Sequence, residues 1–257
     1  MASDVGGSIE LPDLSEAIRI LQQVKLFLGL ERTALASVAS AARTVQVKPQ
    51  TFFFRQGTHA ETVYVLQRGR VRLCQAGPEG HDVLLRLIGP GEIFGPTATL
   101  KDRLYPVSAQ AVRRCQALAW EGRAMVRLME EHPRIALNAI EDLSAHIQEL
   151  RERYLELATQ RVEQRVAHAL LRLADAVGWR STEGLMIDVS LSRQDLAEMT
   201  GTTLYTVSRT LRRWQRRGLV KAGRQRVTLL RSQELIGIAE DHATTSGSDA
   251  PRANRRH

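Results

Sequence analysis

The chain has 257 residues, of which 43% are hydrophobic, so it is long enough to fold as two domains with ordinary cores. Its net charge of +8 is uneven, because residues 161–240 carry 14 basic and 8 acidic side chains whereas residues 1–160 carry 19 and 18. Two isolated cysteines, Cys74 and Cys115, exclude an all-cysteine zinc or iron–sulfur site within one chain. The low cysteine count also argues against a disulfide scaffold and predicts a protein of the reducing cytoplasm. The acidic N-terminus is not expected to be a signal peptide, and without a run of 18 apolar residues no membrane span is expected.

Residues 14–42 have the apolar spacing of helices, interrupted near Gly29, and residues 44–120 change to short apolar runs. These runs are TFFF, VYVLQ, VRLCQA, VLLRLI and AQAV, and turn signals such as GPEG and GPGE separate them. Many short strands at close spacing, with no long helix between them, predict a small antiparallel barrel or roll rather than a parallel α/β sheet.

From Arg123 onward the apolar period becomes helical, and Pro133 is expected to break or kink the start of this region. One apolar stripe then recurs at alternating steps of three and four residues, between charged neighbours. Its members are Ile140, Leu143, Ile147, Leu150, Tyr154 and Leu157. This is the a/d spacing of a coiled coil, so we interpret the stripe as a dimer seam; the alternative is a stripe packed on the chain's own core.

The C-terminal third predicts a helix at about 161–177 and then, in LSRQDLAEMTGTTLYTVSRTLRRWQRRG, a helix, a turn and a second helix. Ser192 and Asp195 have the spacing of a capping box, Gly201 supplies the turn, and Thr203 can cap the second helix. LVKAGRQRVTLL predicts a β-hairpin, and the polar residues from Asp241 onward are expected to be disordered.

The second of these helices separates apolar from basic side chains. On a helical wheel, Leu204, Val207, Leu211 and Trp214 form the inward stripe. The segment from Arg209 to Arg226 has eight basic residues and no acidic one. The major groove of DNA admits one helix and offers acceptor edges to arginine, which indicates double-stranded DNA as the partner. The predicted DNA-binding residues are Thr203, Tyr205, Ser208, Arg209, Arg212, Arg213, Arg216, Lys221 and Arg224.

In order along the chain, FFFRQGTHAETVYVLQRGRVRL, IGPGEIFG, the long helix and the helix–turn–helix segment resemble the Crp/Fnr superfamily of bacterial transcription factors over residues 20–240. The resemblance implies an α+β protein with an N-terminal antiparallel double-stranded β-roll, a long dimerisation helix and a C-terminal winged helix-turn-helix. We therefore divide the chain into an N-terminal extension (1–20), a β-roll effector-sensing domain (21–122), a dimerisation helix (123–160), a DNA-binding domain (161–240) and a disordered tail (241–257).

The family's recognition helix usually carries a glutamate, followed by a serine or glycine and an arginine. Ser208 and Arg209 match the last two, but Tyr205 stands at the glutamate position and Leu204 at the position before it. The resemblance to the family as a whole implies a homodimer that binds an inverted-repeat promoter site and contacts RNA polymerase. Arg209 is the residue that we expect to read a guanine.

Family members that bind cyclic nucleotides use a glycine–glutamate pair and an arginine–serine or arginine–threonine pair. Here Gly95 aligns, but Pro96, Pro106 and Val107 stand where the glutamate, the arginine and the hydroxyl residue are needed, and only Arg103 could substitute. A buried phosphate without its guanidinium is poorly compensated, so we expect an altered effector pocket that cyclic AMP does not control. The candidate pocket residues are Gly91, Glu92, Gly95, Pro96, Arg103, Val107, Ser108, His146 and Leu150.

The family's oxygen sensors need four cysteines, so no iron–sulfur cluster is expected. Haem-based sensing of nitric oxide or carbon monoxide stays open, with His81, His146 and His168 as candidate ligands, and so does a regulator that needs no effector. The chain has no P-loop, nucleophile elbow or HExxH motif, which argues against an enzyme. The alternative of another class is a chromosome-coating protein that binds DNA without regard to sequence. The effector, the target genes and the sign of regulation do not follow from the sequence.

Overall fold

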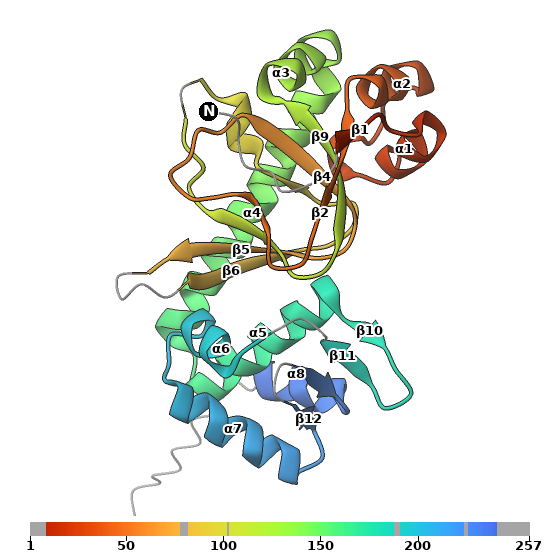
Figure 1. Cartoon of the computed structure of the whole chain (residues 1–257). Helices are drawn as coiled ribbons and strands as arrows, with labels where there is room; N and C mark the ends of the chain where they lie inside the picture. The colour runs from red at the N-terminus through yellow and green to blue at the C-terminus, as the bar shows by residue number, and fades with distance from the viewer. Residues whose placement is uncertain (1–8, 78–81, 102, 188–190, 224–225, 241–257) are drawn as a thin grey trace, which may run out of the picture.

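The computed structural model describes residues 9–77, 82–101, 103–187, 191–223 and 226–240, so the expected tail lies outside the described residues. Figure 1 shows a β-roll in the upper part, a helical module with a small sheet in the lower part, and the long helix α4 running from one to the other. This is the predicted α+β architecture. Within the described residues, no helix combines the length and the apolar character that crossing a membrane requires.

The roll consists of two antiparallel sheets, one with strand order β1-β2-β9-β4-β7 and one with order β3-β8-β5-β6. The strands are β1 (Ile9–Glu10), β2 (Arg43–Val47), β3 (Phe52–Phe54), β4 (Thr62–Arg68), β5 (Val71–Ala76), β6 (Asp82–Ile88), β7 (Ile93–Phe94), β8 (Ser108–Ala111) and β9 (Cys115–Glu121). The five apolar runs of the sequence correspond to β3, β4, β5, β6 and β8, which confirms the predicted strands.

Strands β4 and β9 are covered on both faces, which explains why their sequences are almost continuously apolar. Along β9 the side chains alternate: Ala117 and Ala119 face the interior of the roll, whereas Leu118 and Trp120 belong to a second core beneath the N-terminal helices. The indole Nε1 of Trp120 donates to Val38 O at 2.8 Å and so ties these helices to the sheet.

The interior of the roll is filled with aromatic rings, and Tyr105 is the ring with the most polar contacts. It stacks on Phe54 with ring centroids 3.8 Å apart, while Tyr64 stacks on Phe94 at 5.0 Å. The Tyr105 hydroxyl donates to Thr62 O at 2.7 Å and accepts from Thr62 N at 3.0 Å. Burial raises the pKa of both Tyr64 and Tyr105, so both phenols are neutral in the fold.

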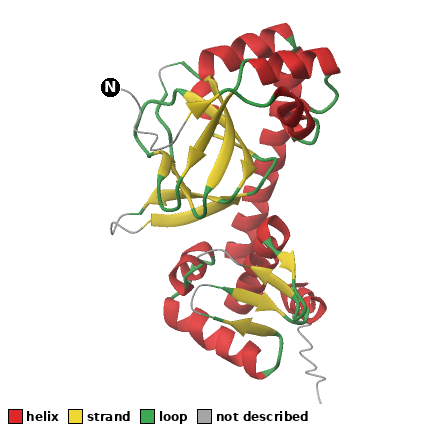
Figure 2. Ribbon diagram, turned by 45° about the vertical axis from the view of Figure 1, so that its right-hand side comes forward, coloured by secondary structure: helices red, strands yellow, loops and turns green. Residues whose placement is uncertain are grey.

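Helices cover one side of the roll, as Figure 2 shows. They are α1 (Leu14–Leu21), the 3₁₀ helix η1 (Lys25–Phe27), α2 (Arg32–Ser40), the 3₁₀ helix η2 (Pro96–Thr99) and α3 (Gly122–Glu131). The carboxylate of Asp13 caps α1 by accepting from Ser15 N and Glu16 N. The expected interruption occurs at Gly29, whose φ of +79° is in the left-handed region.

Helix α4 (Pro133–Thr159) begins where the sequence predicts a break, because Pro133 occupies its first turn and α3 ends at Glu131. Its inner face is anchored near the start. Ile135 and Asn138 are buried, and the Asn138 amide donates to Leu26 O and to Leu28 O at 2.9 Å each. The inner face of α4 is therefore fixed near its start on the N-terminal segment at η1.

The lower module contains α5 (Val162–Val177), β10 (Trp179–Arg180), β11 (Leu185–Ile187), α6 (Arg193–Met199), α7 (Leu204–Arg216), β12 (Val220–Ala222), β13 (Val227–Leu229) and α8 (Ser232–Glu240). The strand order of its sheet is β10-β11-β13-β12. The helix–turn–helix and the hairpin agree with the sequence prediction, whereas the strand pair β10–β11 and helix α8 were not predicted. Both missed features are short: α8 packs on α5, and β11 is held between β10 and β13 in the sheet.

We expect Tyr105→Phe to lower the free energy of unfolding by about 1–3 kcal/mol, because Thr62 N would lose its buried partner. Urea unfolding without DNA measures this, and Tyr205→Phe, which removes the same hydroxyl from an exposed ring, is the control. Equal stability of the two variants would contradict the assigned role of the Tyr105 hydroxyl.

The raised pKa of Tyr105 also predicts a pH dependence. A phenol whose pKa is higher in the folded state contributes stability that is fully present below the unfolded pKa of about 10 and is lost as the pH rises above it. The stability of the wild-type protein should therefore fall above about pH 10, and it should fall less steeply in Tyr105→Phe. Parallel curves for the two proteins would count against a buried, neutral Tyr105.

Candidate nucleic-acid interface

Helix α7 presents one basic face to solvent. Thr203 caps it by accepting from Thr206 N at 3.2 Å, as the sequence predicts. Val207, Leu211 and Trp214 are buried, whereas Tyr205 is 71% exposed and Arg209, Arg212 and Arg216 are exposed. Leu204, which the helical wheel places inward, is instead 49% exposed, because the first turn of α7 extends beyond the core.

An open hollow of about 970 Å³ lies over this face. The side chains that line it are Arg193, Leu204, Tyr205, Ser208, Arg209, Arg212, Gln215 and Arg216. Arg193, the first residue of α6, was missed by the sequence analysis, and its position directly after the Ser192 cap was the available signal. The hollow thus collects four guanidinium groups from two helices.

Ser208, a predicted DNA-binding residue, has a different environment from its neighbours. It is 8% exposed, and its hydroxyl accepts from Arg193 Nη1 at 3.4 Å. Its contact in the protein is therefore with the guanidinium that reaches the hollow from α6.

Two other predicted residues have carboxylate partners within the module. Arg213 pairs with Glu163 on α5, and the same carboxylate accepts from Trp214 Nε1 at 2.7 Å. Lys221 on β12 pairs with Glu183, with Nζ–O distances of 2.7 and 2.9 Å. Arg224 lies outside the described residues. Among the predicted residues, the exposed basic face of α7 is thus formed by Arg209, Arg212 and Arg216.

The turn between α6 and α7 is fixed by a side chain that the sequence analysis did not identify. Arg165, in the first turn of α5, donates to Thr200 O at 2.8 Å, to Gly201 O at 3.3 Å and to Gln160 O at 2.8 Å. Gly201 has a φ of +57°, and a Cβ there would lie 3.0 Å from the Leu157 side chain. One guanidinium therefore connects the end of α4, the start of α5 and the turn.

The predicted seam residues all lie on the outer face of α4 in the single chain. Their exposed fractions are 61% for Ile140, 59% for Leu143, 58% for Ile147, 62% for Leu150, 71% for Tyr154 and 48% for Leu157. Because the opposite face of α4 packs on the roll, this stripe does not belong to the core of the chain. A continuous exposed apolar stripe of this size is typical of a protein interface.

The candidate effector residues are spread over several environments rather than gathered in one pocket. Gly95 has a φ of +75°, and a Cβ there would meet Phe54 at 3.1 Å and Tyr105 at 3.4 Å. Val107 packs against the same aromatic cluster, and the Ser108 hydroxyl accepts from Gln56 N at 2.9 Å. Aromatic rings therefore occupy the space beside Gly95.

The other candidate effector residues lie at the surface. Pro96 and Arg103 are exposed, and Arg103 borders a separate hollow of about 830 Å³ between η2 and α3. Gly91 forms a turn with a φ of +84°, and Leu150 belongs to the outer stripe of α4. The arginine that was considered as a substitute for the phosphate ligand is thus not in the interior of the roll.

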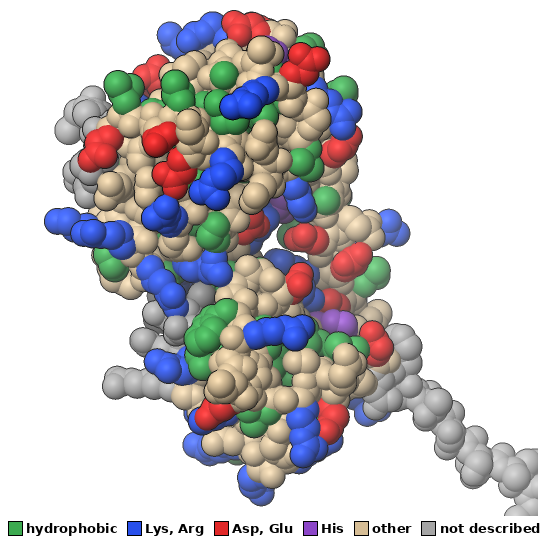
Figure 3. Space-filling view, turned by 90° about the vertical axis from the view of Figure 1, so that its right-hand side faces the viewer, with side chains coloured by type: hydrophobic (Ala, Val, Ile, Leu, Met, Phe, Trp, Pro, Cys, Tyr) green, Lys and Arg blue, Asp and Glu red, His purple; other side chains and the backbone are tan. Residues whose placement is uncertain are grey.

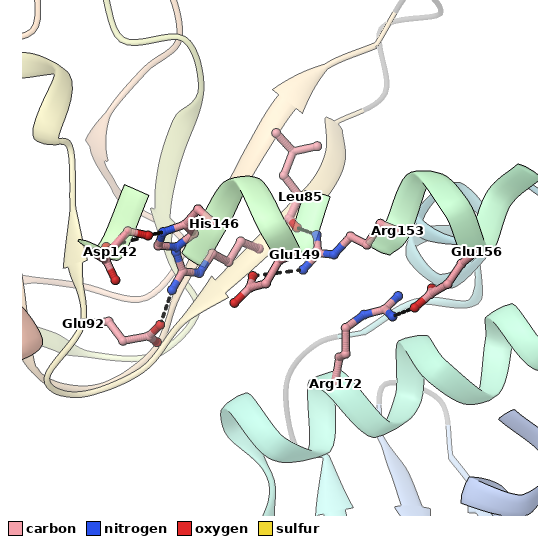
Figure 4. A network of polar contacts seen from close by, with 9 residues as sticks. Leu85, Glu92, Asp142, His146, Glu149, Arg153, Glu156 and Arg172 are labelled. Carbon is pink, nitrogen blue, oxygen red and sulfur yellow. Dashed lines mark hydrogen bonds and ion pairs between the residues drawn. The ribbon is translucent and has the colours of Figure 1, made fainter. Parts of the chain in front are cut away.

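Glu92 and His146 take part in a polar network between the roll and α4, which Figure 4 shows. Glu92 pairs with Arg86 at 2.6 Å and also accepts from Gly89 N. Arg86 contacts Nε2 of His146, whose Nδ1 lies 2.7 Å from Asp142 O. Both ring nitrogens of His146 therefore contact protein groups.

The candidate haem ligands His146 and His168 each contact different polar groups of the protein. Nε2 of His168 lies 3.3 Å from Gln160 Nε2, and its Nδ1 lies 3.9 Å from Glu156. His81 falls outside the described residues. In the part of the chain that the structure describes, no group of three His, Cys, Asp or Glu side chains is arranged to hold a metal ion.

The network continues along α4 toward the lower module. Arg153 donates to Leu85 O at 3.3 Å and lies 4.0 Å from Glu149, while Glu156 pairs with Arg172 on α5. Burial and the neighbouring Arg172 lower the pKa of Arg153. Figure 3 shows charged side chains of both signs where the two lobes meet.

Two family models match the chain in the order of its two lobes. The cyclic nucleotide-binding domain matches residues 44–132, and the Crp-like helix-turn-helix domain matches residues 164–238. A transcriptional regulator of Thermus thermophilus, LdrP, is 31% identical over 184 residues, which cover 71% of this chain and 89% of that protein. The nitrogen fixation regulation protein FixK of Azorhizobium caulinodans is 30% identical over 205 residues, 79% of each chain.

Solved structures agree with this assignment. A CRP-family transcriptional regulator from Thermus thermophilus superposes with a TM-score of 0.63 at 28% identity, covering 76% of this chain and 95% of that one. The order of roll, long helix and helix-turn-helix is therefore shared with a regulator of known structure. On these matches the chain belongs to the Crp/Fnr family of transcription regulators.

Proposed function

We propose that this regulator acts as a homodimer that binds an inverted-repeat promoter site through helix α7. The observation that carries the proposal is the hollow over α7, where Arg193, Arg209, Arg212 and Arg216 converge and the described residues of the lining include no carboxylate. Arginine pairs with guanine O6 and N7 in the major groove and with phosphate oxygens beside it, so such a surface can both read and hold DNA.

The positions of these arginines along α7 support different roles for them on DNA. Arg209 is in the second turn of α7, near the helix start, where side chains of recognition helices meet base edges. Arg212 and Arg216 lie one and two turns later, where the helix leaves the groove. We therefore propose that Arg209 reads a base and that Arg212 and Arg216 contact phosphates, with Tyr205 as the second residue that reaches the bases.

The outer stripe of α4 supports a second copy of this chain as the partner. Its residues follow a/d spacing over two and a half heptads, as far as Leu157 beside the turn at Gly201. A parallel pair of such helices would place the two α7 helices about a two-fold axis, which is the symmetry of an inverted repeat. RNA polymerase in the cytoplasm is the further partner that we propose, because the relatives are regulators of transcription.

The roll supports the loss of cyclic-nucleotide control. Pro106 and Val107 replace the arginine and the hydroxyl residue that neutralise the phosphate, and Pro96 replaces the glutamate of the cassette. The aromatic side chain of Tyr105 lies beside Gly95. A phosphate among these rings would lack the arginine of the cassette, and burying it without a guanidinium partner would cost several kcal/mol. Arg55 borders the hollow beside these rings, but its guanidinium lies over the Phe52 ring, 3.8 Å from the centroid. We propose that the roll of this chain does not respond to cyclic AMP.

The dimer assignment predicts the effect of charges in the stripe. Ile147→Glu together with Leu150→Glu should make the protein monomeric in sedimentation equilibrium and reduce its affinity for an inverted repeat at least about a hundredfold, because binding energy from one half-site is lost. Ala145→Glu together with Gln148→Glu adds the same charges to the same turns off the stripe and should leave the dimer intact. A dimeric stripe variant would refute the assignment.

The roles of the arginines predict different losses on DNA. Arg209→Ala should cost about 1–3 kcal/mol per half-site and relax the choice at one guanine, whereas Arg216→Ala should weaken all sequences alike and lower the salt slope by about one unit per contact. Binding-site selection, with affinities at two salt concentrations, measures both effects. Arg231→Ala removes a charge from the start of α8 and is the control.

For these variants, the decisive result concerns sequence preference. If Arg209→Ala keeps the full site preference and loses only affinity, Arg209 is a phosphate contact and its assignment as the base reader is wrong. If even the wild-type protein shows no site preference, the protein coats DNA without regard to sequence and the proposed function itself fails.

The replaced cassette predicts no saturable binding of cyclic AMP in calorimetry, even at millimolar nucleotide, and no change in DNA affinity when the nucleotide is added. Arg103→Ala should behave like the wild-type protein in both measurements. A micromolar dissociation constant that Arg103→Ala abolishes would show that Arg103 replaces the missing phosphate ligand.

A further inference from the structure

We propose that the strand pair β5–β6 of the roll sets the separation of the two recognition helices, with Arg72 as the positioning residue that holds α6. This inference rests on the proposed dimeric binding to an inverted repeat. It assigns a role in the choice of DNA site to a residue of the roll, on strand β5 at the edge of the roll that faces the lower module in Figure 1.

The polar part of the contact is an ion pair between the two lobes. Arg72 Nη2 on β5 donates to Oδ1 of Asp195 on α6 at 3.2 Å, and Arg72 Nε donates to Cys74 Sγ at 3.0 Å. The side chains of Arg72 and Asp195 are only 24% and 9% exposed. Charge-assisted hydrogen bonds with limited access to water are among the stronger polar contacts and fix orientation as well as distance.

Asp195 is also the residue that caps α6. Its other oxygen, Oδ2, accepts from Ser192 N and from Ser192 Oγ at 2.7 Å each, and Asp195 N donates to Ser192 Oγ at 3.0 Å. The carboxylate that Arg72 holds is therefore rigid with respect to α6. A movement of α6 away from the roll would break the ion pair without disturbing the cap.

The apolar part of the contact joins the cores of the two lobes. Cys74, Leu84 and Leu87 come from β5 and β6, are 3–4% exposed, and belong to the same buried cluster as Leu191 and Leu196 beside and within α6. A third attachment lies at the end of α5, where Arg70 Nη2 is 3.5 Å from Val177 O. The lower module therefore packs on the roll along both α5 and α6.

These contacts restrict rotation of the lower module about the short link between α4 and α5. α4 ends at Thr159 and α5 begins at Val162, so the covalent link between the seam helix and the lower module is two residues long. Without the roll, the module would be held by this link, by Arg165 on Gln160 O and by the pair of Glu156 with Arg172, all at the same end of α4. A module attached at one end only could swing about it, and the α7 helices of a dimer could then adopt several separations. The additional attachment at α6, which packs directly on α7, allows one separation.

A rigid separation makes the spacing of the two half-sites a determinant of affinity. Each base pair inserted between half-sites moves them apart by about 3.4 Å and rotates one against the other by roughly 35°. A rigid dimer cannot follow such a change, whereas a dimer with freely swinging modules can. Arg72 lies in the contact between the lobes and is not among the residues lining the hollow over α7, so its removal should change the tolerance for spacing and not the reading of a half-site.

The experiment measures the affinity of the full-length protein for a single half-site and for inverted repeats whose centre is one or two base pairs shorter or longer than the best spacing. For the wild-type protein we expect a loss of at least about tenfold at two base pairs from the optimum. For Arg72→Met we expect this loss to shrink to about threefold, weaker binding to the best repeat, and unchanged affinity for the half-site. Arg72→Lys, which keeps a charge opposite Asp195, should restore most of the spacing preference.

Arg68→Met is the matched control. It removes an arginine from β4 whose ion pair with Glu16, at 2.8 Å, lies entirely within the upper lobe. Its spacing profile should equal that of the wild-type protein. The half-site affinity of Arg72→Met reports whether the lower module is folded, so a misfolded variant cannot imitate the expected result.

Three outcomes would overturn the proposal, and they differ. If wild-type protein and Arg72→Met have the same sharp spacing preference, the contact at Asp195 does not set the separation, while the proposed dimeric function stands. If the wild-type protein binds all spacings equally but each repeat more tightly than the single half-site, the modules swing freely and the role of Arg72 fails while the dimeric function stands. If no repeat is bound more tightly than the half-site, the proposed binding to an inverted repeat fails and the role of Arg72 fails with it.

Discussion

The structure depends on the two faces of α4: the inner face packs within the chain, whereas the apolar outer face has no partner among the described residues of the same chain. Its inner face is fixed by Ile135, by the Asn138 amide on two carbonyl groups at η1, and farther along by contacts of His146 and Arg153 with strand β6. Since this face is occupied, the outer apolar stripe has no place in the chain's own core, and water remains in contact with it. Burial of this apolar surface favours packing of α4 against the same stripe on a second copy of the chain. In the dimer that we propose, the two α4 helices therefore lie along the two-fold axis.

The roll has the fold of its family, and we propose that the chemistry of its interior has changed. Gly95, which the resemblance places at the glycine of the nucleotide cassette, has a φ of +75°, and a Cβ there would lie 2.9 Å from Thr62 O and 3.1 Å from the Phe54 ring. We propose that the polar partners of the cassette have been lost; in this structure the rings of Phe54 and Tyr105 stack on each other, and the Tyr105 hydroxyl bonds to Thr62. The glycine is thus required by the packing of this interior, whatever role its counterpart has in relatives that hold a phosphate. Presence of the glycine alone therefore does not indicate a nucleotide site.

The arginines of the lower module fall into two groups: some have partners within the protein, and others are exposed on α7. Arg165 donates to three backbone carbonyls, Arg213 pairs with the carboxylate that also holds Trp214, and both side chains fix the position of α7. Arg209, Arg212 and Arg216 are left on the exposed face, where Arg193 joins them from α6. The contacts of Arg165 and Arg213 thus fix the helix that carries the positive surface suited to DNA. The ion pair of Asp195 with Arg72 connects the neighbouring helix α6 to the roll.

The sequence by itself determined the order of strands, long helix and helix–turn–helix, because these depend on local periodicity, on caps such as Ser192 with Asp195, and on the break at Pro133. It also identified the basic face of α7, since a helix of known register has only one such face. It could not separate Arg213 and Lys221 from the exposed arginines, because their partners Glu163 and Glu183 lie 50 and 38 residues away along the chain. The contacts of Arg165 with the turn at Gly201 and the pairing of Arg72 with Asp195 were decided only by the tertiary structure. Both join elements that are distant in sequence, and neither spacing nor propensity records how such elements pack.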